Sequence, residues 1–381
     1  MKTERPSSYE EAAEVMGRCG TEGQALRIRG GGTKSGWGRP VPDPHVEVST
    51  GGLDRVLEHN AGDLTAVVQA GARLDTVQET FAEEGQMLAL DPPTLGAATV
   101  GGLLATADSG PLRHRYGGVR DLVLGVTLAL SDGTLARAGG KVIKNVAGYD
   151  LGKLFAGSFG TLGLVVEMAL RLHPLPTRTG TVVGSGDDPS VLSRGASAVA
   201  HAPLEADCVD VSWGGGIGSV LVRLGGADPS ARLADAAALL AGAGLAVDTN
   251  ENDDALWAAQ RIGQRTQGGD AVMKVSALPS VLPDVLAAAE ALGGSVVGRA
   301  ALGLSWIRLP TEDPGEVVAS VEDLRRRLAP APVVVTDAPG EVRTKLDPWG
   351  GETGPVALMR RVKERFDPAG VCAPGLFVGG I

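Results

Sequence analysis

GGKVIKNVAGYDLGKLFAGSFGTLGLVVEMAL, residues Gly139–Leu170, is the stretch of this chain that says most about its fold. A glycine pair leads into a short basic and apolar run, and then into a Gly-Tyr-Asp turn. Gly157, Gly160 and Gly163 follow at a spacing of three, before an apolar strand. Such spacing in a well-packing segment indicates backbone that approaches something flat or charged. Taken alone, the stretch also fits a tight corner.

The length of 381 residues favours two or three domains, and 43% hydrophobic with 21% charged residues is typical of a soluble globular protein. The formal net charge of −10 argues against nucleic acid as a general partner, because phosphate binding needs a basic face. A local basic patch around Arg113–Arg120 stays compatible with this charge.

Cys19, Cys208 and Cys372 are far apart and form no CxxC or Cys/His motif, which argues against a zinc site or an iron–sulfur cluster in this chain. The N-terminus has no apolar signal-peptide core, and no apolar run is long enough to span a membrane. We therefore expect a cytoplasmic protein without a metal. Indirect attachment to the inner face of the cell membrane, through a partner, stays open.

Prolines at His173-Pro174-Leu175-Pro176 mark an expected boundary. Strands and helices alternate on both sides of it, which in the second region predicts an antiparallel sheet with helices on one face, and an α+β protein overall. We expect one domain over residues 1–175, a cap domain over 176–345 and a segment over 346–381 that packs back on the first domain. The expected helices cover 7–20, 73–84, 229–243, 280–293, 313–328 and 356–366; the expected strands cover 25–29, 65–69, 205–213, 217–224, 271–276, 295–301, 303–309 and 331–336.

The first upstream glycine segment is RGGGTKSGWG, Arg29–Gly38. Three glycines directly after a strand free the backbone N–H groups to point at one anion. Thr33 and Ser35 add hydroxyl donors, and Lys34 or Arg29 offsets negative charge. The segment matches neither a Walker A loop nor a GxGxxG fingerprint, so a phosphate site is weighed here against a flexible glycine turn.

The second upstream segment is DPPTLGAATVGGLLATADSG, Asp91–Gly110. Its prolines give a rigid entry, and Thr99–Gly102 is expected to form a turn that allows close approach. A run of small residues after this turn would leave room for an extended ligand. A tightly packed Ala/Gly core turn is the alternative.

In their order and spacing, the three segments resemble the FAD-binding domain of the vanillyl-alcohol oxidase (PCMH-type) superfamily. The stretch that leads from the second segment toward the third, SGPLRHRYGGVRDLVLGVTLALSDG, shares this resemblance. Within this superfamily, the chain is similar to the FAD-binding E-type subunits of glycolate oxidase. The resemblance covers residues 1–175 and extends to the C-terminal FDPAGVCAPG. It implies two α/β subdomains in the first domain and FAD as the cofactor. Since Thr33 and Lys34 stand where some relatives carry a flavin-linking His, we expect the FAD to be non-covalent.

The resemblance also assigns cofactor-binding residues. Those near the pyrophosphate would come from the first loop, those along the pyrophosphate and flavin from the second, and those at the adenine end from the third. Ala107 departs from the family, which often has Asn or Asp there. The full expected set is Arg29, Gly30, Gly31, Gly32, Thr33, Lys34, Ser35, Gly36, Pro92, Thr99, Val100, Gly101, Gly102, Thr106, Ala107, Ser109, Gly110, Tyr116, Gly117, Asp121, Gly160, Gly163 and Val165.

Catalytic relatives are expected to supply histidines from the second domain, often around a metal. In this chain no His lies between residues 202 and 381, and Phe159 stands where the catalytic D-type subunits usually have Glu. An apolar ring accepts no proton. No catalytic residue is therefore assigned.

These absences favour an FAD-binding subunit of a multi-subunit glycolate (2-hydroxy acid) dehydrogenase, with an electron-relay or structural role. Its expected partners are a catalytic D-type FAD subunit and an iron–sulfur subunit. The alternatives are a stand-alone FAD-dependent dehydrogenase of a small 2-hydroxy acid, with arginines such as Arg113, Arg115 and Arg120 as carboxylate binders, and a scaffold subunit without FAD.

Overall fold

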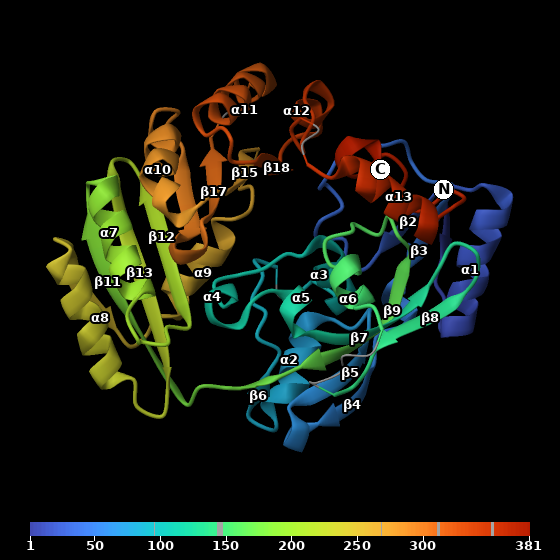
Figure 1. The fold of residues 1–381 in the computed structure, drawn as a ribbon, viewed down its shortest axis with the longest axis horizontal. Helices are drawn as coiled ribbons and strands as arrows, with labels where there is room; N and C mark the ends of the chain where they lie inside the picture. The colour runs from blue at the N-terminus through green and yellow to red at the C-terminus, as the bar shows by residue number, and fades with distance from the viewer. Residues whose placement is uncertain (95, 143–147, 268, 311–312, 352–353) are drawn as a thin grey trace.

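The computed structural model describes residues 1–94, 96–142, 148–267, 269–310, 313–351 and 354–381 (Figure 1). Its strands form a three-stranded, a five-stranded and an eight-stranded sheet and one two-stranded pair. Residues 143–147, which belong to the glycine-rich stretch Gly139–Leu170, lie outside the described part of the chain. The architecture confirms the expected α+β class.

The three-stranded sheet is parallel, with the order β1-β3-β2, and α1 packs beside it. Ser8 begins α1 by accepting the N–H of Glu11, and Gly23 ends it at a φ of 64°. The alternation of buried Val46 and Val48 places one face of β3 in a small core with α1. The elements are β1 (Lys2–Glu4), α1 (Tyr9–Glu22), β2 (Leu26–Arg29) and β3 (Val46–Ser49).

The five-stranded sheet is antiparallel, with the order β4-β5-β9-β7-β8. Its strand β9 is apolar apart from Glu167 and Arg171 because both of its faces are buried: Val166 faces the core with α1, and Met168 faces the helices on the other side. The elements are β4 (Val56–Asn60), β5 (Thr65–Gln69), α2 (Leu74–Ala82), β6 (Gln86–Met87), α3 (Val100–Thr106), α4 (Arg113–Tyr116), α5 (Val119–Leu122), β7 (Val123–Ala129), β8 (Leu135–Gly139), α6 (Leu151–Phe155) and β9 (Leu164–Arg171).

The chain changes sheets after β10 (His173–Pro174), which pairs with β6, and β11 (Arg178–Gly186) starts the eight-stranded antiparallel sheet. The order of this sheet is β14-β11-β13-β12-β16-β17-β15-β18. The remaining strands are β12 (Cys208–Gly214), β13 (Ile217–Gly226), β14 (Ala246–Asn250), β15 (Ala271–Ser276), β16 (Ser295–Arg299), β17 (Leu304–Leu309) and β18 (Val333–Asp337).

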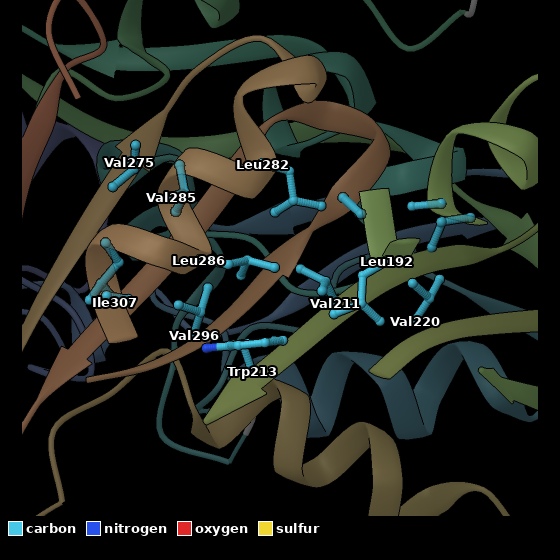
Figure 2. Close-up of a cluster of buried hydrophobic side chains, with 14 of the residues drawn as sticks. Leu192, Val211, Trp213, Val220, Val275, Leu282, Val285, Leu286, Val296 and Ile307 are labelled. Carbon is cyan, nitrogen blue, oxygen red and sulfur yellow. The ribbon is translucent and has the colours of Figure 1, made fainter. Parts of the chain in front are cut away.

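One face of the eight-stranded sheet carries most of the helices of this region (Figure 1). Figure 2 shows apolar side chains of the sheet, such as Val211 and Ile307, packed against Leu192 of α7 and Leu286 of α10. The helices are α7 (Pro189–Ala200), α8 (Ser230–Gly242), α10 (Leu282–Glu290) and α11 (Pro314–Arg327), and α12 (Gly340–Lys345) follows β18.

The opposite face of this sheet is covered by α9 (Asp254–Ile262) and by the N-terminal half of the chain. Trp257 of α9 packs against Cys208, Leu221 and Leu112, the last from the segment before α4. Arg115 of α4 also forms an ion pair with Asp207, at 3.0 Å. Helices therefore occupy mainly, but not solely, one face of the sheet.

The last segment returns to the N-terminal half through α13 (Val356–Phe366) and the residues after it. Leu26 of β2 donates to the carbonyl of Val371 and accepts from the N–H of Ala373, both at 2.8 Å. Lys363 donates to the carbonyl of Thr161, at 2.7 Å, in the third glycine segment. The C-terminal residues thus contact both the small sheet and the loop before β9.

One expectation about local structure was wrong: Thr99–Gly102 is no open turn, because Thr99 is the N-cap of α3 and its hydroxyl accepts the N–H of Gly102. The sequence patterns had assigned no element to the stretches that form β11, α7, β14 and α9. Their glycines and short apolar runs give a weak periodic signal, and packing against the eight-stranded sheet stabilises them.

Candidate functional site

The three glycine segments surround one cavity with an empty volume of about 1000 Å³, which includes its opening to solvent. β2 leads into the first segment, the second segment contains α3, and the third segment continues into β9. The expected cofactor-binding residues that line this cavity are Arg29, Gly30, Gly31, Gly32, Thr33, Lys34, Ser35, Thr99, Gly101, Gly102, Thr106, Gly160, Gly163 and Val165.

The glycines of the first two segments are needed so that the segments can contact each other. A Cβ on Gly31 would lie 1.7 Å from the carbonyl oxygen of Ala97, and one on Gly30 would lie 2.1 Å from the hydroxyl of Thr99. A Cβ on Gly101 would lie 2.6 Å from the Cβ of Ala70. Part of the glycine pattern therefore serves backbone packing, which holds the cavity walls together.

In the third segment, Gly160 and Gly163 have φ values of 73° and 141°, which favour glycine. Between the glycines, Phe159 also has a positive φ, of 56°. Its N–H donates to the carbonyl of Ala105 at 2.7 Å, and the N–H of Gly157 donates to Leu104 at 2.9 Å. These bonds fix the third segment to the C-terminal end of α3.

Other expected residues lie outside the lining of the cavity. Val100 is fully buried in the core of the five-stranded sheet. Tyr116 stacks on His173 and donates to Asp207, at 3.3 Å, rather than facing the cavity. The structure buries Pro92, Ser109 and Gly110 and half-buries Gly36 and Ala107. The carboxylate of Asp121 accepts a hydrogen bond from the N–H of Gly118, the residue after Gly117.

Some residues of the cavity were missed by the sequence analysis. They include Arg27, Ile28, Trp37, Thr50, Ala70, Ser158, Leu164 and Leu376, and Phe159 had been noted only as a departure from catalytic relatives. Most of them neighbour expected residues in the sequence, so the loops themselves were the available signal. Leu376 comes from the C-terminal segment and carried no such signal.

Asp108 is the most informative residue that was missed. Its carboxylate lies 3.0 Å from Lys34 Nζ and accepts from Arg265 Nη2 at 2.9 Å. Burial lowers the pKa of Lys34, and Asp108 opposes this shift. The Arg265 guanidinium also lies over the ring of Trp37, 4.5 Å from its centroid. Two cations around one buried carboxylate connect both upstream glycine segments to the region after α9.

A second polar group lies on the face of the eight-stranded sheet that meets the N-terminal half. Arg299 and Asp210 form a fully buried ion pair at 2.9 Å, and Arg299 Nε and Nη2 have no hydrogen-bond partner. The Arg299 guanidinium and Lys274 Nζ lie 4.9 and 5.7 Å from the centroid of the Trp306 ring. Burial, with the repulsion of Arg113 as the next cause, lowers the pKa of Lys274 to about 8. The group carries more positive than negative charge, which suits an anionic ligand.

Burial raises the pKa of Asp210 to about 7 and that of Asp91 to about 6, against the attraction of Arg299. The folded chain then holds protons that the unfolded chain releases, so we expect the free energy of unfolding to fall as the pH rises from about 4 to 7. In Asp210→Asn this fall should end near pH 6, where Asp91 finishes titrating. Denaturant titrations at several pH values test this, and an unchanged profile in the variant would contradict it.

The lining of the cavity suits FAD held without a covalent bond. Its walls combine exposed glycine backbone, the hydroxyls of Thr33 and Ser35 and the cation of Lys34, which fit a pyrophosphate, with Ile28 and Leu164, which fit a flat apolar group. No His or Cys belongs to this lining. Within the described residues, no three His, Cys, Asp or Glu side chains gather as a possible metal site.

Comparison with known proteins agrees with this geometry. Residues 3–139 match the model of a family described as FAD binding domain. An uncharacterised FAD-linked oxidoreductase of Mycobacterium tuberculosis is 27% identical over 424 residues, covering 98% of this chain and 90% of the relative. Glycolate oxidase subunit GlcE of Escherichia coli is 35% identical over 174 residues, covering 45% of this chain and 49% of that subunit.

A solved structure of alkyldihydroxyacetonephosphate synthase superposes with a TM-score of 0.72 at 16% identity. The superposition covers 98% of this chain and 76% of that one, and shows a shared fold. Among the described helices, none combines the length and apolarity needed to cross a bilayer.

Proposed function

We propose that this FAD-linked oxidoreductase, whose residues 3–139 are an FAD-binding domain, is the FAD-binding subunit of a multi-subunit 2-hydroxy acid dehydrogenase that acts on glycolate. The observation that carries the proposal is Phe159 in the cavity wall, an apolar ring at the position where the catalytic D-type subunits usually have Glu. The similarity of 45% of the chain to glycolate oxidase subunit GlcE supports it.

In this proposal the chain's own residues bind and orient the cofactor. The backbone amides of Gly30–Gly32 and the hydroxyls of Thr33 and Ser35 would hold the pyrophosphate, while Asp108 keeps Lys34 at the cavity. Bound FAD supplies the capacity to accept and pass on electrons. The aromatic and aliphatic side chains exclude water from the inner part of the cavity.

The expected partners are a catalytic D-type FAD subunit and an iron–sulfur subunit, because the described residues gather no candidate metal site and no histidine lies between residues 202 and 381. Contact with the inner face of the cell membrane would then occur through the complex. These partners, and non-covalent binding of FAD, belong to the proposal.

A stand-alone dehydrogenase of a small 2-hydroxy acid is the second candidate. The full-length similarity to a mycobacterial FAD-linked oxidoreductase favours it, and so does the cationic group around Lys274 and Arg299, which could hold a carboxylate. The FAD-binding domain argues against the third candidate, a scaffold without FAD.

Flavin spectra of the purified chain separate these candidates. We expect flavin absorbance that persists when glycolate or D-lactate is added anaerobically, and that bleaches once the catalytic subunit is also present. Free flavin should appear in the supernatant after acid precipitation. Bleaching of the isolated chain by substrate would establish the stand-alone enzyme, and a failure to bleach with all partners present would contradict the subunit proposal.

A further inference from the structure

An aromatic cluster of Trp37, Phe159, Trp349 and Phe377 joins the FAD cavity to the C-terminal residues. The ring centroids of Phe159 lie 6.3 Å from Trp37, 5.0 Å from Trp349 and 5.4 Å from Phe377. Trp349 and Phe377 are themselves 4.9 Å apart, in an edge-to-face arrangement. Phe159 contacts all three of the other rings and therefore lies at the centre of the cluster.

The cluster holds part of the C-terminal segment against the cavity. The carbonyl of Leu376 accepts hydrogen bonds from Trp349 Nε1 and from the backbone N–H of Arg39, each at 3.0 Å. The Leu376 side chain, next to Phe377, is itself part of the cavity wall. Leu376 thus lines the cavity although it comes more than 200 positions after the third glycine segment.

The backbone of Phe159 adopts a conformation that is unfavourable for a residue with a side chain, with a φ of 56°. Glycine would adopt it more readily, as its neighbour Gly160 does. The contacts of the Phe159 ring with the other three rings offset this unfavourable backbone conformation. A ring at this position therefore has a role that the surrounding glycines cannot fill.

We propose that Phe159, through its ring contact with Phe377, is a positioning residue that holds Leu376 in the wall of the cavity, so that bound FAD and the docked C-terminal segment stabilise each other. The proposal rests on the FAD-binding domain and not on the subunit role. Because such coupling is reciprocal, FAD should protect the C-terminal segment as much as that segment retains FAD.

The test compares Phe159→Leu, Phe377→Leu and the double variant. An aromatic pair contributes about two- to tenfold in an equilibrium constant, so each single variant should raise the Kd for FAD by roughly that factor. The double variant should raise the Kd for FAD little more than one single variant does, because each single change already removes the contact between Phe159 and Phe377. Quenching of tryptophan fluorescence by FAD gives the Kd, and Phe159→Tyr should restore it.

Limited trypsin digestion supplies a readout that is independent of activity. FAD should slow cleavage within α13 of the wild-type chain at least severalfold, and much less in Phe159→Leu. Phe366→Leu is the matched control, since Phe366 packs on Phe155 at 5.6 Å, away from the cavity. Its effect on the Kd should be small and additive with that of Phe159→Leu. The proposal would be overturned by an unchanged Kd in Phe159→Leu or by additive effects of Phe159→Leu and Phe377→Leu on the Kd. A wild-type chain that takes up no FAD would overturn it as well.

Discussion

Gly31→Ala is expected to abolish FAD binding and to lower the free energy of unfolding by about 3 kcal/mol, at the upper end of the range for overpacking. The new Cβ would lie 1.7 Å from the carbonyl oxygen and 2.9 Å from the carbonyl carbon of Ala97. Since the obstacle is backbone, no side-chain rotation relieves it, and the first two glycine segments must separate. The measurements are a denaturant titration and the flavin content of the purified variant.

Gly36→Ala is the control for this variant, because it adds the same methyl group to the same loop. The nearest atom to its Cβ would be a guanidinium nitrogen of Arg343 at 3.9 Å, which is ordinary contact. We expect Gly36→Ala to bind FAD with an affinity within about twofold of the wild-type value, a difference below 0.5 kcal/mol. Equal loss of FAD in both variants would show that loop flexibility, and not contact between the two segments, explains the glycines.

The sequence predicted elements best where one periodic pattern was uninterrupted. The strands β5 and β15 and the helix α13 have the expected bounds. The pattern failed at α3, where Gly101 and Gly102 suggested a turn. Gly101 is required there because the helix lies directly against Ala70, which only contacts between distant segments reveal.

The part of the site that the glycine backbone forms could be predicted from the sequence. Glycine clusters after strands mark a cavity wall from the sequence alone, and many of the expected residues do line it. Side chains that matter through partners distant in the sequence gave no such signal. Lys274 and Arg299 occupy ordinary polar positions of their strands. Arg299 is buried and Lys274 half-buried because the N-terminal half covers that face of the sheet.

Asp108 shows the same limit within a loop that had been recognised. Its neighbours Thr106, Ser109 and Gly110 were expected to bind the cofactor, but a lone Asp in a run of small residues looks like a turn residue. Its partners Lys34 and Arg265 come from a separate loop and from beyond α9. Three segments must fold together before this carboxylate has a role.

Asp108→Asn is accordingly expected to destabilise the protein by about 3–5 kcal/mol, the range for breaking a buried ion pair. The side chains of Lys34 and Asp108 are only 6% and 4% exposed, so an amide at position 108 leaves two buried cations without a counter-charge. The pKa of Lys34, already lowered by burial, should fall further because Asp108 now supports its charged form.

The pH dependence separates this electrostatic effect from simple loss of packing. With the pKa of Lys34 lowered further, the variant should recover part of its stability as the pH rises through the new folded-state pKa toward the ordinary pKa of lysine, because in that window the folded chain has shed a proton that the unfolded chain keeps. Asp323→Asn is the control, since Asp323 pairs with two solvent-exposed arginines, Arg326 and Arg327, and should leave stability nearly unchanged. If Asp108→Asn lowered the stability as little as Asp323→Asn, the charges of Lys34 and Arg265 could not depend on Asp108. The link between the first glycine segment and the region after α9 would then lie in the stacking of Arg265 on Trp37 alone.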